Sequence, residues 1–250
     1  MTSERLDIII PVYNEGEGFH RVLEALRCNV RTPFRVLLCY DHDGDTTLQA
    51  IQSYPQASEI TIVPVKNPSR GPHAAVMAGL RYSDSPARLV YPGDDDYNAG
   101  IVDRMHRLAQ QGCDIVAASR FMPGGSMKGC PWLKAFLVRS SAFVLHRVAR
   151  VPTHDASNGF RLFSQRVVEQ IPVQSSQGFT YSLELLVKCH RLGWRIGEVP
   201  AQWYQRKAGA SRFRVLKWLP GYLRWFFYAF ATTYLRRRHV EAHPDQTAGA

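Results

Sequence analysis

The stretch Tyr91-Pro92-Gly93-Asp94-Asp95-Asp96-Tyr97-Asn98 joins a short apolar run, residues 87–91, to three consecutive carboxylates. An apolar run of this length that ends in Pro-Gly is typical of a buried strand that stops at a turn. Because alternate side chains of an extended segment share a face, we expect Asp94 and Asp96 to converge and Asp95 to point away. Two such oxygen ligands suit Mg²⁺ or Mn²⁺, with water and substrate phosphates completing the coordination. The alternative for an isolated acidic triplet is a solvated turn, and the rest of the chain has to decide between the two.

The same strand–turn–helix pattern recurs along the first half of the chain. Each of the first four predicted strands is followed by a turn and then by apolar residues at helical spacing. This alternation predicts an α/β fold with a mainly parallel, doubly wound sheet whose strand ends form one crevice. Acidic side chains from three separate strands meet at that edge, which favours a binding site over chance solvation. The predicted strands are 6–12, 34–40, 59–65, 87–91 and 113–118, and the acids are Glu15, Asp41, Asp43, Asp94 and Asp96.

The second half of the chain has a different character. We expect a mobile Gly- and Pro-rich loop first, then a long helix with interleaved basic residues, a turn that enters a short strand, an amphipathic helix and a last strand. These predicted segments are 121–131, 132–150, 155–163, 178–192 and 195–201. We see no interdomain linker, so we expect one domain over 1–215, a separate aromatic and basic helix over 216–238, and a disordered tail over 239–250.

Composition places the chain among ordinary globular proteins, but its charge is uneven. Of 250 residues 45% are hydrophobic and 21% charged, and the net charge is +10. Nine Lys or Arg and no acid lie between residues 204 and 238, which predicts a polyanionic surface or an anionic ligand for this region. The basic region lacks a nucleic-acid-binding motif, so we expect no nucleic acid partner. Five scattered cysteines without a Cys-x-x-Cys pair favour reduced thiols in the cytosol. The chain contains no uncharged apolar stretch of 18 residues, so we expect no membrane span.

Aromatic and basic side chains are combined over residues 219–238. Pro220 is expected in the first turn of this helix. The apolar stretch 225–235 is about half of the ~20 residues needed to cross a bilayer. Such a composition suits a helix that lies in the headgroup region of anionic lipid. The alternative is a helix buried against the core or in a dimer interface.

Six motifs follow one another along the chain: Pro11-Val12-Tyr13-Asn14-Glu15, the acidic turn at 41–45, Asp94-x-Asp96, Ala118-Ser119-Arg120-Phe121, Asp155-x-x-x-Gly159-Phe160-Arg161 and Arg206-x-x-Gly209-x-Ser211-Arg212. In this order and at these spacings they resemble family 2 glycosyltransferases of the dolichol-phosphate mannose synthase type, which have the GT-A fold. The likeness covers about residues 6–218. Six ordered motifs are specific for the family and moderately specific for its polyprenyl-phosphate subgroup.

The resemblance implies a nucleotide-sugar donor, either a GDP- or a UDP-hexose carrying mannose or glucose. The donor-side residues that it implies are Pro11, Tyr13 and Glu15 for the nucleoside, Asp41 or Asp43 for the base or ribose, Asp94, Asp96 and Asn98 for Mg²⁺ or Mn²⁺ on the diphosphate, and Arg206 and Arg212 for a flap that closes over it. The acidic turn departs from the family's usual Asp-Asp-Gly-Ser, which leaves the base preference open.

The resemblance also implies a polyprenyl phosphate acceptor at the cytoplasmic, inner face of a membrane. Arg120 and Arg139 would hold the lipid phosphate, whose oxyanion needs alignment rather than a strong base. Asp155 would orient this acceptor, or act as base if the acceptor is a hydroxyl. With Asp96, these three are the expected catalytic residues of an inverting transfer. Two alternatives stay open: a glycan or small-molecule hydroxyl acceptor, and an inert nucleotide-binding, membrane-associated protein.

Overall fold

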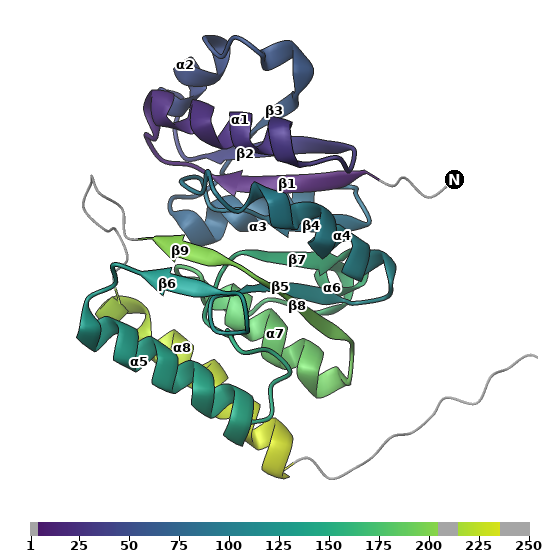
Figure 1. The fold of residues 1–250 in the computed structure, drawn as a ribbon, viewed down its shortest axis with the longest axis vertical. Coiled ribbons are helices and arrows are strands. Elements are labelled where there is room, and N and C mark those ends of the chain that lie inside the picture. The colour runs from purple at the N-terminus through teal and green to yellow at the C-terminus, as the bar shows by residue number, and fades with distance from the viewer. Residues whose placement is uncertain (1–4, 205–214, 236–250) are drawn as a thin grey trace, which may run out of the picture.

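A seven-stranded sheet crosses the centre of the molecule in the computed structural model, which describes residues 5–204 and 215–235 (Figure 1). Its strands are β1 (Leu6–Pro11), β2 (Phe34–Tyr40), β3 (Thr61–Lys66), β4 (Ala87–Val90), β5 (Ile115–Ser119), β7 (Arg161–Ser164) and β8 (Ile196–Pro200). They lie in the order β3-β2-β1-β4-β7-β5-β8, and all neighbours are parallel except β7, which runs antiparallel to β4 and β5. The prediction of a mainly parallel sheet is confirmed.

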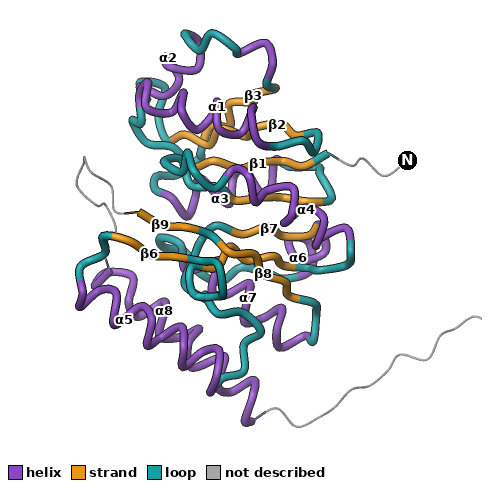
Figure 2. Tube along the Cα trace, viewed as in Figure 1, coloured by secondary structure: helices purple, strands orange, loops and turns teal. Residues whose placement is uncertain are grey.

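Helices cover both faces of this sheet (Figure 2). They include α1 (Phe19–Asn29), α2 (Thr46–Gln52), α3 (Pro72–Tyr82), α4 (Val102–Gln110), α6 (Gln165–Gln170) and α7 (Thr180–Leu192). Ile8 and Ile10 of β1 belong to the core on the side of α1 and α4, whereas Ile9 belongs to the core on the side of α3 and α7. Because successive strand residues point to opposite faces, one apolar strand supplies both cores, and the doubly wound arrangement is confirmed.

A second, two-stranded sheet was not predicted. β6 (Ser126–Lys128) lies within the Gly- and Pro-rich segment that the sequence analysis expects to be a mobile loop, and it pairs in parallel with β9 (Gln202–Tyr204). Each strand has only three residues, too few to show a period-2 pattern. Their pairing depends on two segments that are distant in the chain, so no local signal could reveal it.

Two long helices lie at one end of the molecule (Figure 1). α5 (Trp132–Phe143) continues into a π-helical turn, Val144–Val148, and α8 (Val215–Phe230) continues into another, Ala231–Leu235. Pro220 lies inside α8, not in its first turn as expected, because the helix already begins at Val215. No helix in the described part of the chain has the length and hydropathy of a membrane-spanning segment.

One face of α8 packs on the domain. Trp225 is buried, its Nε1 donates to Ser175 Oγ at 3.0 Å, and Lys188 Nζ lies 4.9 Å from the centre of its ring. Arg224 Nη2 donates to Gln174 Oε1 at 2.7 Å. The expected alternative of a helix packed against the core is therefore confirmed for this face, while the opposite face, with Phe227, is exposed.

Candidate active site

Three acid-bearing turns meet at one edge of the sheet. β1 lies between β2 and β4 and is parallel to both, so the carboxyl ends of all three strands lie side by side. The turns that follow these strands carry the motif that ends in Glu15, the acidic turn 41–45 and the acidic triplet. In open α/β sheets, ligands bind at this edge. The sheet order therefore brings together the donor-side residues that the sequence places in separate segments.

The turn after β1 is locked to the start of α2. Asn14, whose φ of 53° is in the left-handed region, donates from its main-chain N to both oxygens of Asp45, at 3.0 and 3.1 Å. Glu15 N donates to Thr47 Oγ1 at 3.1 Å, and Thr46 N donates to Asn14 Oδ1 at 3.2 Å. Asp45 also caps α2 by accepting from Thr47 N at 2.9 Å. Asp45 and Thr47, both buried, thus fix the loop that presents Tyr13 and Glu15.

Sequence reasoning did not single out Asp45 or Thr47. A signal was available, because an aspartate directly before a helical segment is a typical N-cap. The second link, to the turn after β1, had no signal, because it joins residues more than thirty positions apart.

Asp41 and Asp43 take different places in the acidic turn. Asp41 accepts from Asn67 Nδ2 and from Gly71 N, both at 2.8 Å, so both of its oxygens hold the loop before α3. Asp43 is exposed and pairs with Lys66 Nζ at 2.6 Å. Tyr13, across the crevice edge, lies edge-on to His42 with ring centres 5.6 Å apart. Asp41 thus shapes the loop, and Asp43 and Tyr13 are the groups that face solvent.

The acidic triplet is divided between a buried residue and two exposed ones. Asp95 is buried and accepts from Asn98 N at 2.9 Å and from Asn98 Nδ2 at 2.6 Å, whereas Asp94 and Asp96 are exposed. Burial raises the pKa of Asp95 to about 6, although the hydrogen bonds from Asn98 lower it. Asp95 therefore organises the turn and its two neighbours are exposed, while the convergence of Asp94 and Asp96 stays a prediction.

Asn98 has a structural role in this arrangement. Its Nδ2 donates to the carbonyl of Gln202 at 2.8 Å, and its Oδ1 accepts from Gln202 N at 2.9 Å. Because the buried amide already joins the acidic turn to β9, its oxygen is engaged within the protein. We therefore leave Asn98 out of the metal coordination proposed below, in contrast to the expectation from the sequence.

The exposed pair Asp94 and Asp96 fits a divalent ion that is bound together with a diphosphate. Among the described residues, no group of three or more His, Cys, Asp or Glu side chains could hold a metal ion on its own. A magnesium ion on a nucleotide typically takes one or two carboxylates and completes its shell with waters and phosphate oxygens. Two exposed carboxylates at the carboxyl edge of β4 match that donor set.

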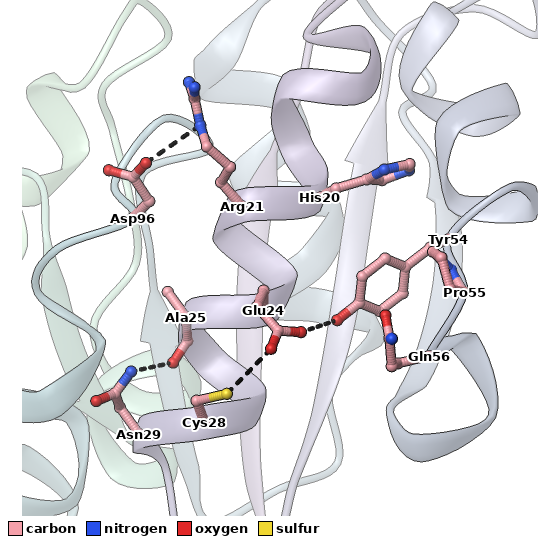
Figure 3. A pocket seen from close by; sticks show the side chains of 10 residues that line it. All are labelled: His20, Arg21, Glu24, Ala25, Cys28, Asn29, Tyr54, Pro55, Gln56 and Asp96. Atoms are coloured by element: carbon pink, nitrogen blue, oxygen red, sulfur yellow. Dashed lines mark hydrogen bonds and ion pairs between the residues drawn. The ribbon is translucent and has the colours of Figure 1, made fainter.

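Asp96 has a partner that sequence reasoning missed. Arg21, in the first turn of α1, places Nε 3.2 Å from Asp96 Oδ2 (Figure 3). The two residues stand at one end of a hollow of about 570 Å³ along the outer side of α1, whose far wall includes Tyr54. Of the predicted site residues only Asp96 borders this hollow. Nothing in the sequence distinguishes Arg21 from an ordinary exposed helix residue.

Arg120 and Asp155, the residues expected on the acceptor side, form a buried ion pair. Arg120 follows β5, and its Nε donates to Asp155 Oδ2 at 2.6 Å while its Nη2 donates to Asp155 Oδ1 at 2.9 Å. Ser157 Oγ donates to the same Oδ1 at 3.0 Å and accepts from Arg120 Nη2 at 2.9 Å. Burial alone would raise the pKa of Asp155, but the charge and hydrogen bonds of Arg120 outweigh it and lower the pKa. A carboxylate held in this way is a poor general base.

Arg139, on α5, lies beside the same aromatic ring as Arg120, that of Phe121. Its guanidinium carbon lies 5.9 Å from the centre of the Phe121 ring, and that of Arg120 lies 5.1 Å from it. The structure therefore brings together the two arginines that the sequence analysis assigns to one phosphate. Arg120 is mostly buried and paired, whereas Arg139 is exposed and can turn toward a ligand.

A third guanidinium, that of Arg161, is fully buried and contacts the main chain at Asp155. Its Nη2 donates to the main-chain carbonyls of Asp155 and Ala156, at 3.2 and 2.6 Å, and its Nη1 donates to the carbonyl of Ser182. Burial lowers the pKa of Arg161 to about 10, so the side chain is still charged at neutral pH. Arg161 thus holds the main chain that positions Asp155, a role that the sequence analysis did not assign to it.

Of the other residues expected on the donor side, the structure describes only Pro11. Pro11 ends β1, where the strand meets the turn that carries Tyr13. Arg206 and Arg212, expected to close over the diphosphate, lie outside the described residues.

The chain matches one protein family and is similar to two glycosyl-transferring proteins of known name. Residues 7–172 match the family described as "Glycosyl transferase family 2". The chain is similar to the polyprenol monophosphomannose synthase of Mycolicibacterium smegmatis, with 23% identity over 232 residues that cover 86% of this chain and 87% of that protein. It is also similar to the dolichol-phosphate mannosyltransferase of Pyrococcus furiosus, with 24% identity over 217 residues, or 84% of this chain and 59% of that protein.

Among solved structures, the fold resembles that of glucosyl-3-phosphoglycerate synthase from Mycobacterium tuberculosis. That structure contains Mn²⁺, uridine diphosphate and phosphoglyceric acid. The TM-score is 0.62 and the identity 16%, and the match covers 92% of this chain and 78% of that one. At this identity the likeness supports the expected GT-A-like fold and leaves the ligands to be argued from the site.

Proposed function

The chain belongs to glycosyl transferase family 2, and we propose that it transfers a hexose from a nucleotide sugar to a polyprenyl phosphate with inversion at the anomeric carbon. The observation that carries the choice of acceptor is the Arg120–Asp155 ion pair, which engages the carboxylate that was expected to act as base for a hydroxyl acceptor. The names of two relatives, a polyprenol and a dolichol phosphate mannose transferase, support the same choice.

On the donor side, the locked turn after β1 would hold the nucleoside through Tyr13 and Glu15. Asp94 and Asp96 would hold Mg²⁺ or Mn²⁺, a role supported by the Mn²⁺ and uridine diphosphate in the neighbouring structure. When bound by these two carboxylates, the ion would neutralise the charge that develops on the leaving nucleoside diphosphate. Asp45 and Thr47 contribute indirectly, because they keep the turn in one conformation before the donor binds.

On the acceptor side, the phosphate oxyanion is itself the nucleophile. It needs alignment and charge neutralisation, which Arg139 can provide through a bidentate contact. A hydroxyl acceptor would need a group to take its proton, and Asp155 is unsuited to this because both of its oxygens are engaged and its pKa is lowered. Asp155 instead orients Arg120. This reverses the expectation that Asp155 acts as base in the hydroxyl alternative.

The test is a transfer assay in detergent with labelled GDP-mannose or UDP-glucose, Mn²⁺ and a short polyprenyl phosphate. Label should enter the organic phase. Arg139→Ala should raise KM for the lipid phosphate about 10- to 100-fold, the equivalent of one lost charge-assisted contact. KM for the donor should change little, since Arg139 lies on the acceptor side.

Arg147→Ala is the matched control, because it removes the same charge from the π-helical turn that extends α5. Label that enters only a glycan or small-molecule hydroxyl, with Arg139→Ala as active as wild type, would replace the lipid acceptor with the hydroxyl alternative.

We also propose that α5 and α8 dock on an anionic membrane surface, which would present the lipid acceptor to Arg139. Both helices expose large apolar side chains, and Tyr234 Oη donates to Val148 O at 2.8 Å where their ends meet. This surface, the aromatic platform, comprises Trp132, Leu133, Phe136, Leu137, Phe143, Leu219, Leu223, Phe227, Tyr234 and Leu235. Basic residues and no acids accompany it on both helices, as anionic headgroups require.

Flotation with lipid vesicles tests this docking. The chain should float with vesicles that contain phosphatidylglycerol. The partition coefficient of the double variant Phe136→Asp/Phe227→Asp should be at least about 10-fold lower, because two aromatic side chains that would enter the lipid are replaced by charged ones. Tyr82→Asp, which introduces the same charge at an exposed aromatic position at the end of α3, should float as wild type does. Equal flotation of the double variant would show that the platform is not the contact, and a wild type that does not float would rule out docking.

A further inference from the structure

The first observation is that Asp96 is already paired. Arg21 Nε lies 3.2 Å from Asp96 Oδ2, with 77% of the Arg21 side chain and 37% of the Asp96 side chain exposed. Figure 3 shows Arg21 extending from α1 toward Asp96 and away from the hollow's other lining residues. The contact joins the helix after β1 to the turn after β4, so it spans the edge at which we place the donor.

The second observation is that Glu24, the carboxylate nearest to Arg21 on α1, is engaged by other side chains. Glu24, three residues on, would be the usual helical partner of Arg21. Its oxygens instead accept from Arg27 Nε and Nη2, at 3.0 and 2.7 Å, and from Tyr54 Oη at 2.9 Å. The hydrogen bonds from Arg27 are the main reason that the pKa of Glu24 is lowered to about 2. Glu24, the acid of α1 itself, is thereby engaged elsewhere, and Arg21 pairs with the acidic turn.

A guanidinium and a divalent cation compete for the same carboxylate. Both are drawn to the charge of Asp96, and they repel each other at the distance that shared coordination would require. A pair this exposed is weak, so a divalent ion that also gains phosphate ligands can displace the arginine.

We propose that Arg21 is a built-in competitor for the divalent cation: it holds Asp96 while the site lacks metal and is displaced when metal binds. The inference rests on the proposed role of Asp96 as a metal ligand. Its consequence is that the affinity of the chain for metal alone is lowered. The displaced guanidinium stays on the first turn of α1, at the edge where the diphosphate binds, and Arg is suited to contact phosphate.

The experiment measures binding of Mn²⁺ alone to the full chain, by electron paramagnetic resonance of free Mn²⁺, without nucleotide. Arg21→Ala should bind Mn²⁺ about two- to five-fold more tightly than wild type, as expected for loss of one exposed ion pair. The gain should shrink when salt is raised to 0.5 M, where such pairs are screened. Arg31→Ala, which removes the same charge just beyond the end of α1, should bind Mn²⁺ as wild type does.

A double-mutant cycle separates this competition from a general charge effect. In the Asp96→Asn background, adding Arg21→Ala should not increase the affinity for Mn²⁺, because the carboxylate for which the two cations compete is gone. Unchanged or weaker Mn²⁺ binding in Arg21→Ala, or a gain that persists in the Asp96→Asn background, would overturn the inference. Failure of the proposed function looks different: Asp96→Asn would then bind Mn²⁺ as well as wild type, or no label would enter lipid in the transfer assay.

Discussion

Asp96→Ala is expected to lower the rate of hexose transfer by about 100- to 1000-fold, the usual cost of removing one group that stabilises charge in a transition state. The carboxylate is one of the two exposed acids at the end of β4 that we propose to hold the divalent ion on the leaving diphosphate. Chelation of the metal by EDTA should reproduce the loss in the wild-type chain and change the variant little. The measurement is the initial rate of label transfer to polyprenyl phosphate at saturating Mn²⁺.

The loss should be confined to activity. Asp96 is exposed and its ion-pair partner, Arg21, is more exposed still, so the free energy of unfolding should change by less than about 0.5 kcal/mol. Glu169→Ala, an exposed acid on α6, is the control for loss of one surface carboxylate. Wild-type transfer rates in Asp96→Ala would remove the metal from the proposed mechanism.

Asp155→Asn is expected to lower the free energy of unfolding by about 3–5 kcal/mol, the range found when one partner of a buried ion pair is removed. The asparagine amide would point one donor at Arg120, whose Nε and Nη2 both donate to the native carboxylate, and Arg120 would keep its charge without a counter-ion. Urea unfolding at neutral pH measures the change. Transfer activity should fall as well, because Arg120 loses the group that orients it.

The pH dependence gives an independent check. The pKa of Asp155 is lowered from 3.8 in the folded state, so the ion pair stabilises the fold at every pH above the pKa of the unfolded chain. This contribution to the free energy of unfolding is lost as the pH falls through the folded pKa. Wild type and Asp155→Asn should therefore converge in stability in acid. Asp84→Asn is the matched control: Asp84 also faces arginines, Arg5 and Arg35, but it is 74% exposed, and we expect a cost below about 1 kcal/mol. An equal cost in both variants would contradict the argument from burial.

Local patterns were sufficient for the order of the elements. Runs such as 34–40 and 87–91 are short, apolar and bounded by turn residues, and both form strands of the central sheet. The acidic triplet shows the expected alternation of exposed and buried side chains, but it lies in a turn beyond β4, where Asn98 holds Asp95. Pro220 was misplaced because α8 begins earlier than the position at which proline is most common.

The roles of individual site residues depended on contacts across the sheet. From the sequence, Asp155 was expected to orient the acceptor or to act as a base, and the bidentate contact with Arg120 instead points to a role in positioning that arginine. Asn98 was expected to be a metal ligand, but its amide is hydrogen-bonded to the main chain of Gln202. No sequence pattern indicated the contact of Arg21 with Asp96. Each of these contacts joins residues at least 35 positions apart, and a local pattern carries no information on such partners.

The sequence by itself determined the alternation of strands and helices and the two-sided burial of the strands, because both follow from the local spacing of apolar residues. Once the strands are placed, the acids that follow three of them are read directly from the chain. The tertiary structure decided which of those acids are engaged and which are presented to solvent. The reason is physical: a carboxylate's charge, pKa and availability depend on what the order of strands places within hydrogen-bonding distance, and for Asp45, Asp96 and Asp155 that neighbour comes from a distant segment.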